Sequence, residues 1–437
     1  MRIPPAKPSV VSQSEPPAGR QSAGAVFLTF LALGLTSFGG PVAHIGYFRE
    51  AFVVRRRWMD ERGYADLVAL CQMLPGPTSS QVGIGIGLDK AGFAGALAAW
   101  VGFTAPSAIL LIALGYGVVA FDDVIPPGLL RGLGAVVVAV VAQAVWGMAQ
   151  TLCPDARRFT IAVLAAAVVL ALGGATAQVA VIAAGGLAGL LFLRDEAPAV
   201  PAAPEPSRAG PGPGVPPGMT PSMAPGGASG IAPVITIAAL ALFFVLLVFL
   251  PVAASIWPSP ALALVDSFYR VGSLVFGGGH VVLALLKAEV LPAGWVPEDV
   301  FLAGYGAAQA VPGPLFTFSA YLGTVMEAPP GGWAGGLLCL AAIFVPSFLL
   351  VIGALPGWNA LRRIERMRRA MLGVNAAVVG LLLAALYDPV WTSGILSARD
   401  FILALAAFAL LAAWKLPPWL VVILGAVAGW GMGALAG

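Results

Sequence analysis

The sequence contains little charge. Only 10% of its 437 residues are charged, whereas 59% are hydrophobic. A soluble protein of this length needs far more charge to cover its surface, and many stretches match the roughly 20 helical residues that cross a hydrocarbon core. The composition therefore predicts an all-α polytopic membrane protein. The net charge is only +3 and the arginines lie in connecting loops, so they are orientation signals and no nucleic-acid partner is expected.

Groups that carry out chemistry are also few. The three cysteines, Cys71, Cys153 and Cys339, lie in or beside apolar segments and form no Cys-x-x-Cys pair, so we interpret them as small hydrophobic residues. No His-Glu-x-x-His sequence of a metalloprotease occurs. The chain is therefore not expected to be an enzyme, and no cofactor or metal site is predicted.

What the sequence does contain is a duplication. Phe38-Gly39-Gly40-Pro41 recurs as Phe276-Gly277-Gly278-Gly279-His280, 238 residues later. Trp58, Gln72 and Pro75-Gly76-Pro77 recur 237 residues later as Trp295, Gln309 and Pro312-Gly313-Pro314. A duplicated membrane unit with helix breakers at matching places is typical of a secondary transporter.

The chain divides into a tail, two halves and a linker. Residues 1–23 are typical of a disordered N-terminal tail, residues 24–195 form the first half, the Pro/Gly/Ala-rich residues 196–230 form a flexible linker, and residues 231–437 form the second half. Thirteen spanning segments are expected, at about 24–41, 64–88, 92–120, 130–150, 159–173, 176–193, 231–254, 260–285, 300–325, 332–354, 370–387, 400–414 and 417–435.

The two halves are expected to have opposite orientations. If every segment crosses the membrane, segments 24–41 and 260–285 are the first and the eighth, which makes the halves an inverted-topology repeat with broken helices. This trace places the arginines of residues 49–62 outside and those of residues 362–369 inside, so only one cluster obeys the positive-inside rule. If segment 24–41 is instead re-entrant, both clusters are inside.

The Phe-Gly-Gly motifs predict breaks within the membrane. A glycine weakens a helix by about 1 kcal/mol and an interior proline by about 3 kcal/mol. The freed backbone groups must then be satisfied by protein, water or substrate. A simple packing kink is the alternative for each motif.

The Pro-Gly-Pro motifs predict junctions between two half-helices. Proline suits the first turn of a helix, and Thr78-Ser79-Ser80-Gln81 follows directly after Pro77. Free N–H groups and hydroxyls at such a helix start form an uncharged cradle for an oxyanion. The residues after Pro314 are more apolar, so the first half is expected to supply more polar contacts; a structural hinge is the alternative.

Polar side chains near these breaks complete the candidate site. Gln72 and Gln309 precede the Pro-Gly-Pro motifs by one turn and could bind an oxyanion or hold unwound backbone. His44 and His280, the only histidines, follow the glycine breaks and could couple transport to protons. The candidate substrate-binding residues are Phe38, Gly39, Gly40, Pro41, Gln72, Pro75, Gly76, Pro77, Thr78, Ser79, Gln81, Phe276, Gly277, Gly278, Gly279, His280, Gln309, Pro312, Gly313 and Pro314.

On these motifs the chain resembles the chromate ion transporter family in its bidomain form. Trp58-Met59-Asp60-Glu61 and the matching pair Phe103-Thr104-Ala105-Pro106-Ser107 and Phe344-Val345-Pro346-Ser347 add to the resemblance. It covers nearly the whole chain except the tail and the linker. The second half departs from the pattern at Gly279-His280, where the first half has Pro41-Val42.

The resemblance implies a multi-pass protein of the bacterial inner membrane that exports chromate and confers chromate resistance. Sulfate is a tetrahedral dianion of similar size, so a carrier of sulfate or another oxyanion is the alternative, and an anion channel is a further one. Uniport driven by the membrane potential and exchange with protons or sulfate are all open, as are a monomer and a homodimer.

Overall fold

The computed structural model of the chain describes residues 19–120, 126–193, 231–276, 281–327, 329–358 and 364–434. Within these ranges the regular structure is helical and no strand occurs. Five helices are long and apolar enough to cross a membrane: Thr78–Ala120, Arg131–Leu152, Pro233–Ile256, Gly332–Gly357 and Glu365–Gly394. The all-α polytopic class is therefore confirmed. The predicted linker, residues 1–18 of the predicted tail, and Gly277, Gly278, Gly279 and His280 lie outside the described residues.

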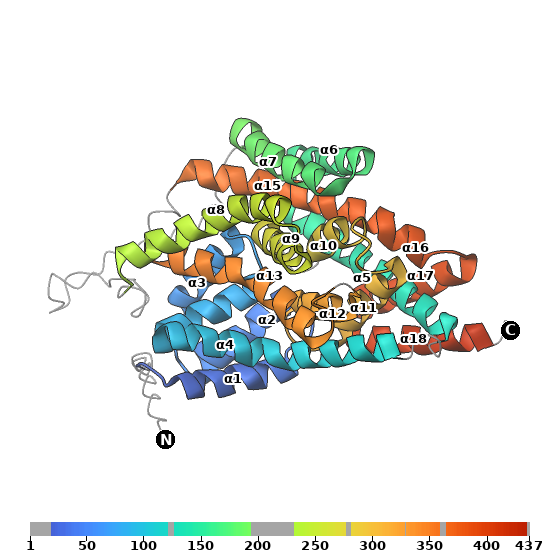
Figure 1. Cartoon of the computed structure of the whole chain (residues 1–437), viewed down its shortest axis with the longest axis horizontal. Helices are drawn as coiled ribbons and strands as arrows, with labels where there is room; N and C mark the ends of the chain where they lie inside the picture. The colour runs from blue at the N-terminus through green and yellow to red at the C-terminus, as the bar shows by residue number, and fades with distance from the viewer. Residues whose placement is uncertain are drawn as a thin grey trace, which may run out of the picture.

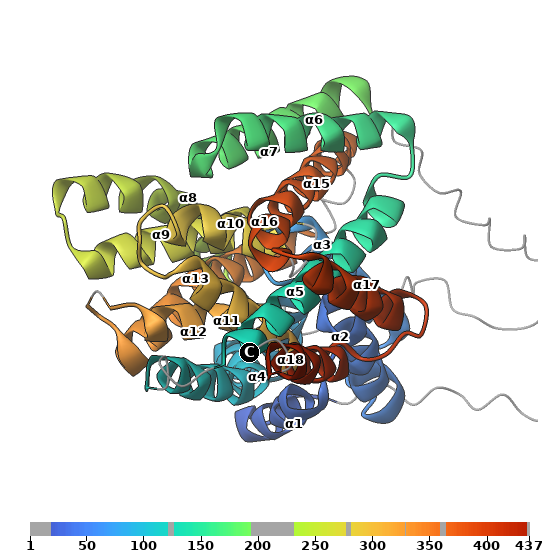
Figure 2. The ribbon, with the colours of Figure 1, turned by 90° about the vertical axis from the view of Figure 1, so that its right-hand side faces the viewer.

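Most helices lie roughly along the long axis of the molecule (Figure 1). The first half contains α1 (Ala23–Thr36), α2 (Gly40–Arg49), α3 (Glu61–Met73), α4 (Thr78–Ala120), α5 (Pro127–Leu152), α6 (Ala156–Leu172) and α7 (Gly174–Phe192). The second half contains α8 (Pro233–Ile256), α9 (Pro260–Leu274), α10 (Val281–Val290), α11 (Glu298–Ala310), α12 (Phe318–Val325), α13 (Gly332–Ala354), α15 (Glu365–Ala385), α16 (Thr392–Gly394), α17 (Ala398–Ala412) and α18 (Pro418–Ala434). Viewed along the long axis, α6 and α7 form an outer edge against α15 (Figure 2).

The first Phe-Gly-Gly break reverses the chain. The ring of Phe30 in α1 lies 5.5 Å from that of Phe48 in α2 and 5.0 Å from that of Phe52, so the two arms lie side by side. Gly39 and Gly40 have φ values of +97° and +76°, which side chains disfavour. The chain therefore enters and leaves on the same side, and we call α1–α2 the first glycine hairpin.

The first Pro-Gly-Pro motif also reverses the chain. A methyl group on Gly85 of α4 would lie 2.7 Å from Leu67 Cδ1 of α3, so these arms are also in close contact. The long α4 is interrupted at Ala91 and Gly92, whose backbone is not helical. Because the part of α4 before this kink packs against α3, only the part after Gly92 is expected to cross the membrane. We call α3 with the part of α4 before this kink the first proline hairpin.

The second half repeats both hairpins. Arg270 of α9 binds Glu289 of α10 at 2.9 Å, which joins the arms of the second glycine hairpin. The hydroxyl of Tyr321 in α12 donates to the carbonyl of Val300, at 3.0 Å, which joins α12 to α11 as the second proline hairpin. Segments 24–41, 64–88, 260–285 and 300–325 therefore fold back on themselves, and the expectation of thirteen crossings was wrong.

The two halves are inverted relative to each other. Trp100 of α4 contacts Phe344 and Phe348 of α13, at 5.6 and 5.7 Å between ring centroids. Further along α4, the hydroxyl of Tyr116 accepts the backbone N–H of Trp333, near the start of α13, at 2.8 Å. These matching helices are thus antiparallel, as an inverted-topology repeat requires.

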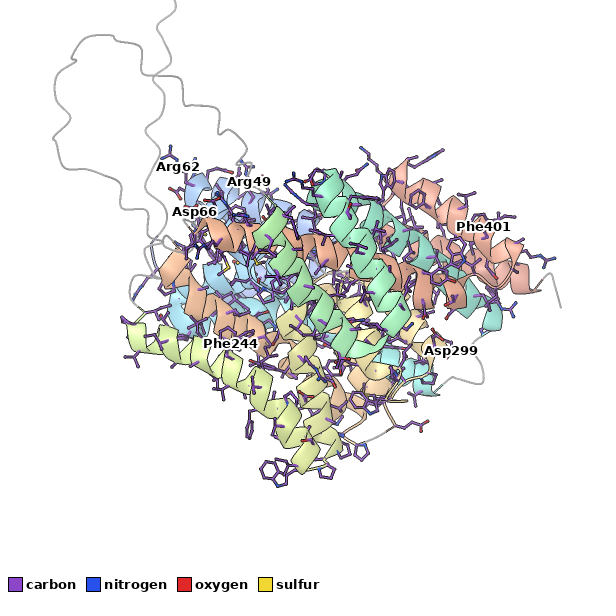
Figure 3. All side chains as sticks on the ribbon, turned by 90° about the horizontal axis from the view of Figure 1, so that it is seen from above. Arg49, Arg62, Asp66, Phe244, Asp299 and Phe401 are labelled. Carbon is purple, nitrogen blue, oxygen red and sulfur yellow. The ribbon has the colours of Figure 1, made fainter. Side chains whose placement is uncertain are left out.

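The arginines of both clusters that the structure describes lie at one end of the molecule. Arg49 pairs with Glu61 at 2.7 Å, and Figure 3 shows Arg49, Arg62 and Asp66 together, far from Asp299 at the start of α11. The start of α15, whose first turns contain Arg366 and Arg369, lies at the same end (Figure 1). Tracing segment 24–41 as a crossing had placed the first cluster outside; its fold-back removes the conflict with the positive-inside rule, which predicts that this end is cytoplasmic.

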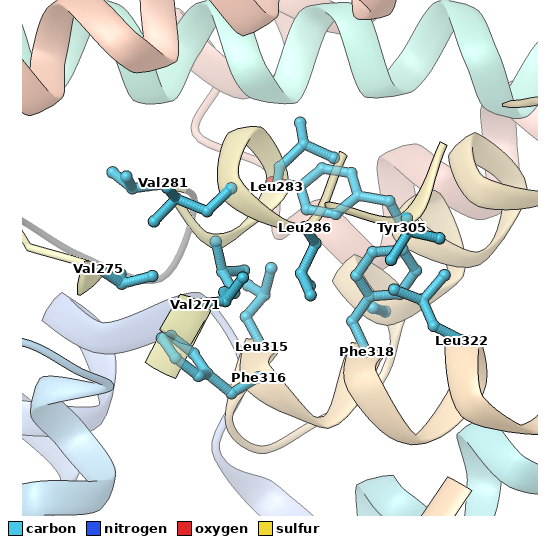
Figure 4. Packing of buried hydrophobic residues seen from close by; sticks show 14 of the residues in the cluster. Val271, Val275, Val281, Leu283, Leu286, Tyr305, Leu315, Phe316, Phe318 and Leu322 are labelled. Carbon is cyan, nitrogen blue, oxygen red and sulfur yellow. The ribbon is translucent and has the colours of Figure 1, made fainter. Parts of the chain in front are cut away.

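The largest apolar core among the described residues surrounds the hairpins of the second half and also includes side chains from α4 to α7 of the first half. Val271 and Val275 of the second glycine hairpin approach Leu315, Phe316 and Phe318, which follow the Pro-Gly-Pro turn (Figure 4). These side chains are at most 7% exposed. The core therefore holds the hairpin tips in fixed positions near the middle of the molecule.

Candidate functional site

The hairpin tips of the two halves meet and exchange hydrogen bonds. The N–H of Gly76, in the first Pro-Gly-Pro turn, donates to the carbonyl of Val275 at 2.6 Å. The N–H of Gly313, in the second turn, donates to the carbonyl of Ser37 at 3.0 Å. Ser37 and Val275 each precede a Phe-Gly-Gly motif. Each proline hairpin thus binds the glycine hairpin of the opposite half, and we call this meeting point the crossing.

A serine from each half lies against the opposite Pro-Gly-Pro turn. A methyl group on Gly76 would lie 2.7 Å from Ser347 Oγ, and one on Gly313 would lie 2.8 Å from Ser107 Oγ. Ser107 donates to the carbonyl of Thr104 at 3.0 Å. Ser347 Oγ is buried and has no hydrogen-bond partner. The two serines therefore occupy equivalent positions in the two halves, but only Ser107 has a hydrogen-bond partner.

His44 lies at the crossing, where its ring contacts three residues of the first half. Its Nε2 is 3.2 Å from the carbonyl of Ser37 and its Nδ1 is 3.2 Å from Ser79 Oγ. The ring packs edge-on against Phe103, at 5.2 Å between centroids. Only 1% of this histidine is exposed. His44 therefore joins the first glycine hairpin, the first proline hairpin and, through the shared Ser37 carbonyl, the second half.

A helix starts at the crossing directly after Pro77. The first backbone bond of the α4 start runs from Gln81 N–H to the carbonyl of Pro77, at 2.9 Å. Gln81 also donates from its side chain to the carbonyl of Pro75, at 2.6 Å, which closes the turn. The residues between them, Thr78, Ser79 and Ser80, are buried with their N–H groups at the positive end of the helix.

At the matching position in the second half, the side-chain hydroxyls are already used in hydrogen bonds to the backbone. Thr317 and Ser319 donate their hydroxyls to the carbonyls of Pro314 and Phe316, both at 2.7 Å. A short 3₁₀ turn, Leu315–Thr317, precedes α12. The unpartnered hydroxyls near the tips include those of Ser37, Ser80, Thr104 and Ser347, and three of these four belong to the first half.

Other predicted site residues are distributed around the crossing. Gln72 is exposed, whereas Gln309 is buried and its Nε2 has no partner. Phe38 packs against Trp419 of α18, at 6.0 Å between ring centroids. Gly277, Gly278, Gly279 and His280 lie outside the described residues. The two glutamines therefore do not occupy equivalent surroundings.

Sequence reasoning did not assign a site role to Ser37, Thr104, Ser107 or Ser347. The signal was present in the repeated Pro106-Ser107 and Pro346-Ser347 pairs. Pro106 and Pro346 could be interpreted as kinks in their helices. Nothing in the sequence spacing indicates that Ser107 and Ser347, which follow them, contact the opposite half. That contact exists only after the two halves are paired.

The crossing is polar without being charged. Residues 37–44, 75–81, 103–107, 275–276, 312–319 and 344–347 include no Asp, Glu, Lys or Arg. Ser37, Ser80 and Ser347 are at most 2% exposed. A ligand could reach these groups only if the hairpin tips separate, and it would find N–H and O–H donors and one imidazole.

Comparison with known proteins gives consistent matches along the chain. The family model described as "Chromate transporter" matches residues 24–190 and again residues 262–430. A chromate transport protein of Pseudomonas aeruginosa is 26% identical over 379 residues, covering 83% of this chain and 80% of that protein. A probable chromate transport protein of Synechococcus elongatus is 26% identical over 416 residues, covering 92% and 93%.

A chromate transport protein of Cupriavidus metallidurans is 24% identical over 392 residues, covering 88% of this chain and 87% of that protein. No solved structure matches the chain. The two regions matched by the family model coincide with the two inverted halves, so the halves are homologous.

Proposed function

Because this chain belongs to the chromate transporter family, we propose that it is a secondary transporter that exports chromate from the cytoplasm across the bacterial inner membrane and so confers chromate resistance. Three relatives that match more than four fifths of the chain are named chromate transport proteins or a probable one, and a fourth is named only as an uncharacterized transporter. The proposed substrate site is the crossing of the four hairpin tips.

The observation that carries this proposal is the pair of exchanged bonds, Gly76 to Val275 and Gly313 to Ser37, surrounded by unpartnered hydroxyls. A tetrahedral dianion needs several hydrogen-bond donors that converge on it. The start of α4 offers backbone N–H groups with a partial positive charge, and Ser79 and Ser80 add hydroxyls. Such a site binds an oxyanion without a lysine or arginine.

The same geometry favours alternating access over a continuous channel. The first hairpins enter from the end that carries the arginine clusters, and the inverted second hairpins enter from the opposite end. Separating the tips on one side would open a path to the crossing from that side, while the contacts on the other side keep it closed. In inverted-repeat transporters one repeat moves against the other around a fixed central site in this way.

Export agrees with the electrical gradient. The free energy of a dianion falls by about 4.6 kcal/mol when it leaves a cell whose interior is negative by 100 mV, since each charge contributes about 2.3 kcal/mol. The membrane potential therefore suffices to drive chromate outward. Sulfate has the same shape and charge, so the neutral donors of the crossing would accept it as well, and a sulfate carrier is the second candidate function.

The test is uptake of labelled chromate into inside-out membrane vesicles that contain the full chain. Parallel samples have the membrane potential collapsed or contain excess sulfate. A Ser79→Ala, Ser80→Ala double variant removes two hydroxyls from the start of α4. Thr160→Ala removes an exposed hydroxyl of α6 that bonds its own helix, and serves as the matched control.

We expect potential-dependent accumulation that sulfate inhibits, a loss of at least tenfold in the double serine variant, and no change in Thr160→Ala. No accumulation above empty vesicles, with the protein present in the membrane, would overturn the chromate assignment. If vesicles with the double serine variant accumulate as much chromate as vesicles with the wild type, the substrate site lies away from the crossing.

A further inference from the structure

We propose that His44 takes up one proton when the oxyanion binds. This inference rests on the proposed function, because it concerns the coupling of the same site. It follows from the two bonds of the imidazole, from the burial of the ring and from the lack of charge around it.

The surroundings of His44 fix its tautomer. A carbonyl oxygen only accepts hydrogen bonds, so the Nε2 atom that faces Ser37 must carry a hydrogen. In the neutral ring Nδ1 is then bare and accepts the hydroxyl hydrogen of Ser79. The hydroxyl of Ser79, at the start of α4, is therefore directed at the imidazole and away from any anion.

Protonation of the ring reverses this bond. With a hydrogen on both nitrogens, Nδ1 donates to Ser79 Oγ, and the hydroxyl hydrogen of Ser79 becomes free to bind an anion. The ring also gains a positive charge beside that anion. One proton taken from water thus supplies both a new donor and a counter-charge, and no covalent bond changes.

Among the described residues, those that contact the His44 ring are Ser37, Ser79 and Phe103, and none of them carries a charge that could balance an imidazolium. α1 has no charged residue, and the α4 residues in contact with His44, Ser79 and Phe103, are neutral. Arg49, on the same helix as His44, is paired with exposed Glu61 at 2.7 Å. On α3, the hydroxyl of Tyr64 donates to the carbonyl of Ile45 at 2.6 Å.

At the far end of its first arm, α4 carries the ion pair of Asp89 and Lys90, at 3.1 Å. Both ring nitrogens of His44 face neutral groups, the Ser37 carbonyl and the Ser79 hydroxyl. A charge on a group as buried as His44 is costly unless it is paired. A bound dianion provides that pairing, so the proton and the oxyanion are expected to bind together.

The bond between His44 and Ser37 extends the effect to the second half. The Ser37 carbonyl accepts both the Nε2 hydrogen of His44 and the N–H of Gly313. A charged donor forms a stronger bond than a neutral one. Protonation therefore strengthens one of the two bonds at this oxygen, and substrate binding is communicated to the contact between the halves.

The experiment measures protons taken up per chromate bound by the purified full chain. Binding heat is recorded in buffers of different ionisation enthalpy, for the wild type and for His44→Gln. A glutamine amide can still donate to Ser37 and accept from Ser79, but it does not titrate. Protons that chromate itself exchanges contribute equally in both proteins. The difference in protons taken up per chromate therefore reports on His44 alone.

We expect about one more proton per chromate in the wild type than in His44→Gln. Because a proton is gained on binding, affinity rises as pH falls, by up to about tenfold per pH unit, and this excess slope disappears in the variant. Ser79→Ala keeps the imidazole and should keep the extra proton while it weakens binding about tenfold.

Equal proton counts in the wild type and His44→Gln would overturn this inference and leave the proposed function intact. If His44→Gln does not fold, loss of the excess pH slope in Ser79→Ala would equally contradict it, since that variant retains the titrating ring. Absence of chromate binding to the wild type at every pH would instead overturn the proposed function itself.

Discussion

At the scale of single residues, two glycines at the tips of the first half have backbone conformations that a side chain would strain. Gly76 has a φ of +120°, and a side chain there would meet Gln81 Nε2 at 2.6 Å and Ser347 Oγ at 2.7 Å. Gly39 has a φ of +97°. Any other residue at either place strains the backbone by about 1–3 kcal/mol. Of these two positions, only Gly76 would also bring a side chain into collision with the opposite half, at Ser347.

We predict that Gly39→Leu and Gly76→Leu each abolish chromate transport while the protein stays in the membrane. The reason is that the tips would no longer meet, although the long apolar helices still insert. Vesicle uptake and the amount of protein in the membrane fraction are measured together. Transport retained in both variants would mean that the breaks serve only as hinges.

Two serines in equivalent places should respond differently to the same change. Ser347 Oγ is buried without a partner, whereas Ser107 Oγ donates to the carbonyl of Thr104. An unsatisfied buried hydroxyl costs about 1–3 kcal/mol. We therefore predict that Ser347→Ala raises the thermal stability of the substrate-free protein and weakens chromate binding. A thermal melt with and without chromate checks both, and Ser107→Ala, predicted to lose stability, is the comparison.

At the scale of elements, the two glycine hairpins are held together by different forces. Aromatic rings of Phe30, Phe48 and Phe52 join α1 to α2. Arg270 joins α9 to α10 through Glu289 and also binds Asp266 at 3.1 Å. Both carboxylate side chains are 10% exposed and Arg270 is 28% exposed, so solvent screens this network only in part.

We predict that Arg270→Leu destabilises the protein more than Glu289→Gln does. The first change leaves two buried carboxylates facing each other without their cation, at a cost near the lower end of about 3–5 kcal/mol because Arg270 is partly exposed. The second keeps an oxygen that accepts from Arg270. Thermal melts of the two variants decide the order, and equal losses would show that the network contributes little.

The positions of the breaks were predictable from sequence, but their consequence was not. Pro-Gly-Pro and Phe-Gly-Gly tell where a helix ends, because proline lacks an N–H and glycine tolerates positive φ. They do not tell whether the next helix continues or returns. That choice depends on contacts between the arms, such as Gly85 against Leu67, which involve residues with no distinguishing pattern.

The same limit applies to the site. The start of α4 after Pro77 was predicted from local chemistry alone. The approach of Ser347 to Gly76, and of His44 to Ser37 and Ser79, depends on how hairpins pack. Nothing in the spacing of 44, 79 and 347 indicates that these residues meet.

At the scale of the whole molecule, the fold-back of the hairpins predicts a definite topology. We expect cysteines placed at Arg55 and Arg366 to react with a membrane-impermeant thiol reagent only from the cytoplasmic side, and one at Asp299 only from the opposite side. All three positions are exposed, and the native Cys71, Cys153 and Cys339 are buried, so background labelling is low. Labelling of Arg55 and Arg366 positions from opposite sides would contradict the re-entrant first half.

The exchange of bonds at the crossing also constrains how the protein is made. The ribosome releases the Gly76 N–H and the Ser37 carbonyl long before their partners, Val275 and Gly313, are synthesised. Backbone groups cannot remain unpaired in contact with lipid, so the nascent first half must wait at the insertion machinery or beside water until the second half arrives. A first half produced alone could satisfy these groups by pairing with a second, inverted copy of itself, since the bonds at the crossing are reciprocal.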